Sequence, residues 1–327
     1  MSVPFDDDPV YLTELPDDLR ARRAEAARRR RWRRRLVALA VLAVLGGVAA
    51  VAVVSLTQGG SGTDASRVQA QPAGGGQRGK PTTATYPADW KPYTGPVPIL
   101  GYHAIQPPVA GSDDPQQFVP QDDFVEQMKW LDENGYEAVT LDQVEDAWYN
   151  GGELPSKPIV LTFDDGYLSQ YVAAFPALEH FHWPGVLNLV AGGADLPDDD
   201  VRKMLDADVP WELASHTISH VDLTTLDSTE LRHEVAGSRR ILQDRFGVPV
   251  DNFSYPAGRY DDAVISAVSD AGYRGATTEV PGLATAAHPF VLNRIEVHLD
   301  DGLDGFVSKL QAAEAGSVQP DTPTPGG

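Results

Sequence analysis

Two short clusters in the sequence carry side chains that could bind a metal ion and act on a water molecule. The first is Asp164-Asp165-Gly166, which directly follows an apolar run, Lys157–Phe163, that predicts a buried strand. Successive side chains of an extended segment point to opposite faces, so one carboxylate can bind a metal ion while the other acts on the water beside it. Taken alone, Asp-Asp-Gly is also typical of an ordinary surface turn.

The second cluster lies about fifty residues further on and contains two histidines, His216 and His220, within Ser215–His220. Histidines at i and i+4 lie on one side of a helical turn, or close together in a tight loop, and can bind one metal ion. Two histidines and one carboxylate, with a coordination position left for water, form the ligand set of a hydrolytic zinc site. The two clusters together therefore predict a hydrolytic metal centre.

The residues of three segments carry a resemblance to a known family. Thr162–Gly166, then Ser215–His220, then Phe253–Gly258 resemble, in this order and separation, the motifs of the polysaccharide deacetylase family (the NodB homology domain, carbohydrate esterase family 4). The resemblance covers about residues 95–312. It implies an α/β fold, a distorted (β/α)7 barrel of the NodB-homology type, with the site at the carboxyl ends of the strands.

The resemblance also implies a role for each matching residue. Asp165, His216 and His220 would bind a divalent metal ion, with Zn²⁺ the first expectation and Co²⁺ or Ni²⁺ the alternatives. Asp164 would be the general base, and the backbone N–H of Ala257 would stabilise the oxyanion. Tyr255 and Pro256 of the third motif are the predicted substrate-binding residues.

Two features depart from the family pattern. The third motif of the family opens with an Arg that steadies the base, whereas this chain has Ser254 there, so Arg259 or Arg294 is expected to take its place. The general acid is either His298, which resembles the family's Leu-x-His motif, or His103. The segment Gly101–Ile105 resembles the opening pattern of poly-N-acetylglucosamine deacetylases, and this favours that subgroup.

Alternating strand and helix patterns surround these motifs. Such alternation predicts parallel βαβ units, and by itself it fits either a barrel or an open doubly wound sheet. The acidic segment 195–200 is interpreted as a solvated loop. Besides the strand before Asp164, the predicted strands are Val97–His103, Tyr136–Thr140, Gly185–Val190, Trp211–Ser215, Asn252–Tyr255, Arg274–Thr278 and Asn293–His298; the predicted helices are Asp123–Asn134, Leu141–Asn150, Tyr167–His180, Ser228–Phe246 and Asp261–Ala271.

The first 94 residues have the composition of an anchor and a tether. Residues 1–35 are polar and basic and are expected to be disordered, and residues 36–56 form an uncharged apolar stretch of 21 residues, long enough to span a membrane as a helix. Because basic residues flank it on the N-terminal side only, the N-terminus is expected in the cytoplasm and the rest outside the cell membrane. The alternative is a cleaved signal peptide. Residues 57–94 read as a flexible linker, residues 95–312 as the catalytic domain and residues 313–327 as a disordered tail.

Charge and composition narrow the partners. Residues 95–327 hold 12 basic and 38 acidic residues, which argues against nucleic acid and fits a neutral or cationic polymer such as an amino sugar. The chain has no Cys, so it has neither disulfides nor thiolate ligands. We therefore predict a membrane-anchored, monomeric, metal-dependent N-deacetylase of an extracellular N-acetylglucosamine polymer. Peptidoglycan N-deacetylation, xylan-type O-deacetylation and a carbohydrate-binding protein on the same fold are the alternatives.

Overall fold

Seven parallel strands close into a barrel in this computed structural model, which describes residues 87–112 and 114–316. The strand order is β2-β12-β11-β10-β9-β8-β7, and β7 pairs back onto β2 to close the ring. The barrel strands are β2 (Ile99–Tyr102), β7 (Pro158–Asp164), β8 (Val186–Leu189), β9 (Glu212–Ser215), β10 (Asn252–Ser254), β11 (Gly275–Pro281) and β12 (Leu292–Glu296). This confirms the predicted (β/α)7 barrel and excludes the open sheet.

The barrel is irregular around β7, whose seven residues are all buried. One edge of β7 pairs with β2, while the other edge is shared by two strands. Its first half pairs with β5 (Glu137–Val139) and its second half, from Thr162 on, pairs with β8. Because β5 occupies part of that edge, the ring is distorted there, and the carboxyl end of β7 is left to project between β2 and β8.

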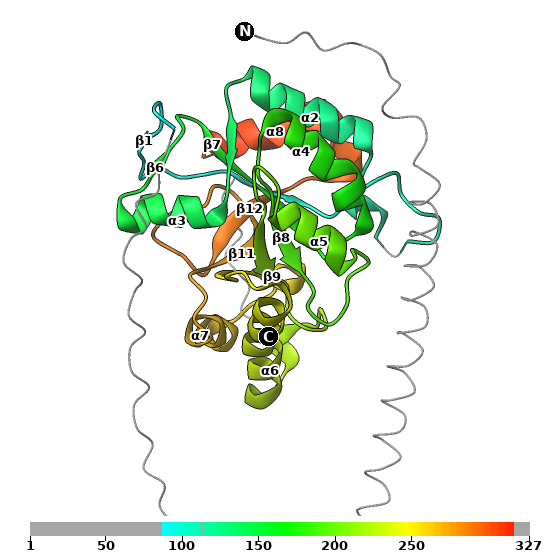
Figure 1. The fold of residues 1–327 in the computed structure, drawn as a ribbon, viewed down its shortest axis with the longest axis vertical. Coiled ribbons are helices and arrows are strands. Elements are labelled where there is room, and N and C mark those ends of the chain that lie inside the picture. Colours follow the sequence, from blue (N-terminus) through cyan, green and yellow to red (C-terminus); the bar gives the residue numbers. More distant parts are fainter. Residues whose placement is uncertain (1–86, 113, 317–327) are drawn as a thin grey trace, which may run out of the picture. The chain divides into compact units, whose positions relative to one another are not determined.

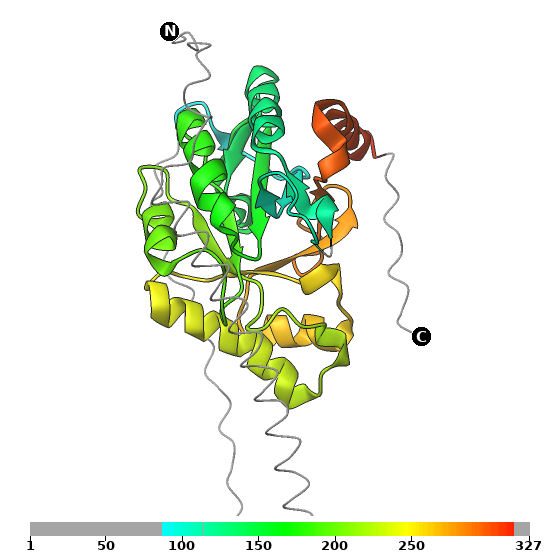
Figure 2. The ribbon, with the colours of Figure 1, turned by 90° about the vertical axis from the view of Figure 1, so that its right-hand side faces the viewer.

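Helices cover the outside of the barrel. The α2 helix packs against both α8 and α4 on one side, and α6 and α7 lie side by side on another (Figures 1 and 2). Both α3 and α6 begin with a capping box, at Thr140 and at Asp227, and end at a left-handed glycine. The helices are α2 (Gln121–Glu133), α3 (Leu141–Asn150), α4 (Phe175–Phe181), α5 (Asp198–Leu205), α6 (Ser228–Phe246), α7 (Asp262–Asp270) and α8 (Gly302–Glu314).

Short elements complete the fold. A π-helix, η3 (Gln170–Ala174), precedes α4, and 3-10 turns lie at η2 (Pro115–Gln117), η4 (Leu223–Thr225), η5 (Pro256–Gly258) and η6 (Leu299–Asp301). Two small strand pairs lie outside the barrel: β1 (Lys91–Pro92) with β6 (Glu153–Leu154), and β3 (Ala104–Ile105) with β4 (Phe118–Val119). The largest apolar cluster fills the space between barrel and helices and includes Phe124 and Met128 of α2 and Phe306 of α8.

The structure differs from the sequence predictions in several places. The folded part begins upstream of residue 95, because β1 pairs with β6 and Trp90 is buried in an apolar cluster. It also extends past residue 312, because α8 runs to Glu314. The predicted acidic loop at 195–200 overlaps the start of α5, and Asp200 in it is buried rather than solvated.

The predicted anchor, residues 36–56, lies outside the described residues, as do residues 1–35, most of the predicted linker and most of the predicted tail. Over residues 87–112 and 114–316, no helix has both the length and the apolar character needed to cross a bilayer.

Candidate active site

The two adjacent aspartates mark the carboxyl end of β7. Asp164 is the last residue of the strand and is almost completely buried, while Asp165 follows in a left-handed conformation with φ of 72°. A non-glycine residue in this region is strained, and such strain gathers at functional sites. Three further non-glycine residues with positive φ, Thr217, His220 and Ala257, belong to the other two motifs. Each of the three motifs therefore contains at least one residue with strained backbone conformation.

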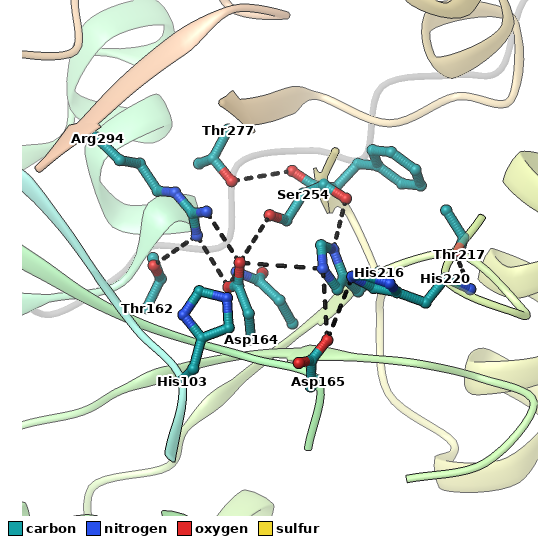
Figure 3. A network of polar contacts seen from close by, with 12 residues as sticks. His103, Thr162, Asp164, Asp165, His216, Thr217, His220, Ser254, Thr277 and Arg294 are labelled. Atoms are coloured by element: carbon teal, nitrogen blue, oxygen red, sulfur yellow. Dashed lines mark hydrogen bonds and ion pairs between the residues drawn. The ribbon is translucent and has the colours of Figure 1, made fainter. Parts of the chain in front are cut away.

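Arg294 of β12, a strand that only β2 separates from β7, holds Asp164. Its Nη1 donates to Oδ1 and its Nη2 to Oδ2, each at 2.9 Å, and Asn188 of β8 donates to Oδ1 at 2.6 Å (Figure 3). Burial would raise the pKa of Asp164, but the charge of Arg294 outweighs this effect and holds the pKa far below its ordinary value. Of the two predicted replacements for the family's third-motif Arg, Arg294 is the one that contacts both oxygens of Asp164. Arg259 instead pairs with Asp222 at 2.6 Å on the surface.

The predicted metal ligands come together. His220 Nε2 lies 3.4 Å and His216 Nε2 lies 3.8 Å from Asp165 Oδ1, and the ligand atoms of the three residues lie within 4.8 Å of one another. His216 Nδ1 lies 2.7 Å from the carbonyl oxygen of Ser254, so Nδ1 carries the proton and Nε2 is left free as a ligand atom (Figure 3). Burial lowers the pKa of His216 against the pull of Asp164 and Asp165, which favours the neutral imidazole that metal binding requires.

This donor set fits a divalent transition metal. Two imidazole nitrogens and one carboxylate oxygen suit Zn²⁺, Co²⁺ or Ni²⁺, and three protein ligands leave coordination positions for water and substrate. The ligand set is thus arranged as the sequence predicted, in a tight loop after β9 rather than on a helix.

A glutamate that the sequence analysis did not single out holds this loop. Glu234 of α6 accepts hydrogen bonds from the backbone N–H groups of Ile218 and Ser219, at 2.9 and 3.0 Å, and from the Ser219 hydroxyl at 2.6 Å. The His220 N–H donates to Thr217 Oγ1 at 2.9 Å. In the sequence, Glu234 looks like any polar residue of a helix. Only its buried position in the structure reveals this role.

The third motif supplies a strained turn and a buried aromatic. Ala257, the predicted oxyanion donor, is exposed, has φ of 51° and lies in η5. Tyr255, predicted to bind substrate, is instead fully buried, its hydroxyl donates to the Phe290 carbonyl at 3.0 Å, and Pro256 is buried as well. Neither side chain offers a surface to a sugar ring, so both substrate-binding assignments are wrong for this structure.

The two candidates for the general acid occupy different surroundings. The His103 ring, directly after β2, lies beside Asp164 and Arg294 in Figure 3, and its charge interacts with Asp164. His298 caps η6 and its Nδ1 lies 3.3 Å from the ammonium of Lys309. An ammonium can only donate, so Nδ1 of His298 acts as an acceptor there. A histidine must carry protons on both nitrogens to act as an acid, and the Lys309 contact takes one of these positions.

Comparison with known proteins agrees with this geometry. Residues 151–276 match the family model described as polysaccharide deacetylase. YxkH of Bacillus subtilis is 29% identical over 206 residues, which cover 62% of this chain and 71% of that protein. The poly-beta-1,6-N-acetyl-D-glucosamine N-deacetylase of Escherichia coli K12 is 30% identical over 239 residues, which cover 59% of this chain and only 36% of that protein.

The fold is also shared with solved structures. The Streptococcus pyogenes deacetylase PplD, solved in complex with acetate, superposes with a TM-score of 0.61 and 25% identity over 66% of this chain and 99% of that one. The family match, the relatives and the closed barrel with its three motif turns lead to one conclusion. Residues 151–276 thus match a polysaccharide deacetylase domain, and the relatives and the solved neighbour support a polysaccharide deacetylase enzyme.

Proposed function

We propose that this enzyme is a metal-dependent N-deacetylase of an extracellular N-acetylglucosamine polymer of the poly-β-1,6 type. The single observation that carries the proposal is the convergence of Asp165, His216 and His220 next to a buried, Arg-held Asp164. A ligand set for a cation and an ionised carboxylate beside it are the two components that hydrolysis of an acetamide needs.

The choice of polymer is supported by the Escherichia coli relative, whose name specifies poly-β-1,6-N-acetylglucosamine, and by the Gly101–Ile105 segment. The alignment covers only 36% of that relative. The acidic composition of residues 95–327 is compatible with a product polymer that gains one ammonium group for each acetyl group removed.

Asp164 receives the proton of the attacking water. Its Oδ2 faces the ligand set, 4.0 Å from His216 Nε2, so this oxygen is the proton acceptor. A carboxylate with so low a pKa is a weak base toward ordinary water. A divalent cation held by Asp165, His216 and His220 would lower the pKa of the water toward that of Asp164, and it would also polarise the acetamide carbonyl.

The remaining steps use the chain's own donors. The Ala257 N–H is placed on an exposed, strained turn and stabilises the negative charge on the former carbonyl oxygen. His103 gives its proton to the sugar nitrogen as the C–N bond breaks, which releases acetate and a free amine. We choose His103 over His298 because Lys309 occupies Nδ1 of His298.

The location and assembly of the enzyme complete the proposal. Residues 36–56 would anchor the chain in the cell membrane with the N-terminus in the cytoplasm, residues 57–94 would act mostly as a tether, and the domain would act outside the cell as a monomer. The apolar stretch and its one-sided basic flank support this arrangement.

The test is an assay of two products on the purified full-length chain. The protein is treated with chelator, restored with Zn²⁺, Co²⁺ or Ni²⁺, and offered β-1,6-linked N-acetylglucosamine oligomers beside peptidoglycan fragments and acetylated xylan. We expect metal-dependent release of acetate with a matching amount of free amine, highest on the β-1,6 oligomers. Acetate without amine would indicate an ester substrate, and a preference for peptidoglycan fragments would replace the proposed polymer.

A further inference from the structure

One side-chain amide connects the backbones of the two residues assigned to proton transfer. Nε2 of Gln170 donates to the carbonyl oxygen of Asp164 at 2.6 Å and to the carbonyl oxygen of His103 at 2.9 Å. Asp164 is the last residue of β7 and His103 follows β2, yet their two carbonyl oxygens accept from one nitrogen. An NH₂ group has two hydrogens, so it can satisfy both carbonyls at once.

The orientation of this amide is fixed by its partners. If the amide were turned over, Oε1 would face two carbonyl oxygens, and oxygen acceptors repel one another. In the orientation present, Oε1 is buried and has no hydrogen-bond partner among the described residues. A buried acceptor without a partner costs free energy. The amide therefore makes its two Nε2 hydrogen bonds although Oε1 is left unpaired.

The local backbone brings Gln170 to this position. Gln170 is the first residue of the π-helix η3, and such wide turns are frequent at functional sites. The residue before it, Ser169, accepts the backbone N–H of Ile105 through its hydroxyl at 3.0 Å. The turn after Asp164 is therefore tied to His103–Ile105 at two points. Both side chains are buried, with exposures of 2% for Ser169 and 0% for Gln170.

We propose that Gln170 is a positioning residue that sets the separation of Asp164 and His103, and so aligns the proton acceptor with the proton donor. This inference rests on the proposed function, in which these two residues exchange protons with water and the leaving amine. A displacement of about 1 Å between reacting groups can lower a rate by about 100-fold. A side chain such as Gln170, which fixes the separation of two such groups, can therefore matter for the rate.

The test compares two buried glutamines in the full-length protein. Gln170→Met keeps the length of the side chain and removes its donors. The matched control is Gln127→Met on α2, where an equally buried glutamine donates to the Gly302 carbonyl at 3.1 Å and accepts from the Tyr102 hydroxyl at 2.8 Å. We expect Gln170→Met to lower kcat about 10- to 100-fold, with KM and metal affinity changed less than about threefold. Gln127→Met should lower the melting temperature but keep kcat.

A second variant tests the role of the donor through pH. Gln170→Glu places an ionised carboxylate against two carbonyl oxygens, whereas its protonated form can donate one hydrogen bond. Its kcat relative to wild type should therefore rise as the pH falls. A residue with a merely structural role would not give this profile.

A third measurement does not depend on activity. Hydrogen exchange of the Ile105 and Gly166 amides, in the metal-free protein, should become about tenfold faster or more in Gln170→Met and stay unchanged in Gln127→Met. If the wild-type chain releases no acetate, the proposed function fails. Faster exchange in Gln170→Met would then still support the role of Gln170 in holding Asp164 and His103 together. Unchanged kcat in a folded Gln170→Met, or an equal loss of kcat in Gln127→Met, would overturn the inference.

Discussion

Arg294 and Asp164, 130 residues apart in the sequence, form a fully buried pair with two hydrogen bonds of 2.9 Å. Arg294 is itself held in place, because its Nε donates to the Thr278 carbonyl at 2.9 Å and lies 3.0 Å from Glu296 Oε1. The position of the family's base-steadying Arg is thus filled by one from β12, which β11 separates from β10, the strand before the third motif.

Replacing Arg294 by Lys should inactivate the enzyme. Lysine keeps the charge but cannot hold both oxygens of Asp164, so the carboxylate loses its fixed orientation. We expect kcat to fall about 100-fold or more, and the free energy of unfolding to fall by about 1–3 kcal/mol because a buried charge is left poorly paired. Turnover assays and denaturant titration measure the two effects.

Arg259→Lys is the matched control. Arg259 is 64% exposed in its side chain and pairs with Asp222 at the surface, so the change should cost less than about 1 kcal/mol and leave kcat intact. A loss of activity in Arg259→Lys equal to that in Arg294→Lys would mean that the assignment of Arg294 is wrong.

Asp165 and Asp164 should fail in different ways when changed. Asp165→Ala removes one of three ligands, so both metal binding and activity should be lost. Asp164→Asn leaves the ligands in place, so metal content should stay near wild type while kcat falls about 10²- to 10⁴-fold through loss of the base. Metal analysis of the purified variants, beside the acetate assay, separates the two. Full activity in Asp164→Asn would contradict the mechanism.

Glu234→Gln should weaken metal binding without touching a ligand. The carboxylate accepts three hydrogen bonds from Ile218 and Ser219, and an amide would turn a donor toward some of these donors. Loss of such support is expected to lower metal affinity about 10- to 100-fold, measured by competition with a chelator. Glu230→Gln, a capping residue on the same helix, is the control and should keep wild-type affinity. If Glu234→Gln bound metal as tightly as Glu230→Gln and wild type, Glu234 would not support the metal-binding loop.

The three residues of the candidate metal site could be predicted because each motif is contiguous and contains its own turn. Asp165, His216 and His220 are brought together by the ends of strands that are recognisable from their apolar runs. The choice between Arg259 and Arg294 could not be made in the same way. It depends on the pairing of β12 with its neighbour β2, which places Arg294 near the end of β7. No local sequence pattern encodes this pairing.

The errors also have physical causes. Tyr255 directly follows β10, and an aromatic residue at such a position can face either solvent or the core. Its ring packs against Phe253 and Tyr260 and lies in the core. The α8 helix was missed because Gly302 and Gly305 in its first turn resemble turn signals. The three aspartates that open α5 read as a loop, although acidic residues stabilise a helix N-terminus.

A buried acidic group far from this chemistry gives the last prediction. Glu145 of α3 is 1% exposed and pairs with Arg274, whose Nε lies 3.0 Å from Oε2. Burial raises the pKa of Glu145 to about 8, against the charge of Arg274 and with help from Asp142. Burial likewise raises the pKa of Asp142 to about 6 and that of Glu212 well above its ordinary value.

The folded protein should therefore lose stability as the pH rises from about 4.5 to about 8. In this window the folded state keeps the proton on Glu145 while the unfolded state has released it, so unfolding becomes easier by up to about 1.4 kcal/mol for each pH unit. Glu145→Gln mimics the protonated form at every pH. It should be more stable than wild type by about 1–3 kcal/mol at pH 9, with a smaller difference at pH 5.

Denaturant titrations of the metal-free protein at pH 5, 7 and 9 measure this change, because removing the metal keeps its own pH-dependent binding out of the comparison. Glu126→Gln, an exposed position on α2, is the control and should run parallel to wild type. Asp142 and Glu212 keep their own proton uptake in Glu145→Gln, so a reduced pH slope is expected rather than a flat one. A Glu145→Gln protein that gains nothing over wild type between pH 5 and 9 would show that Glu145 is ionised throughout, held by Arg274 despite its burial.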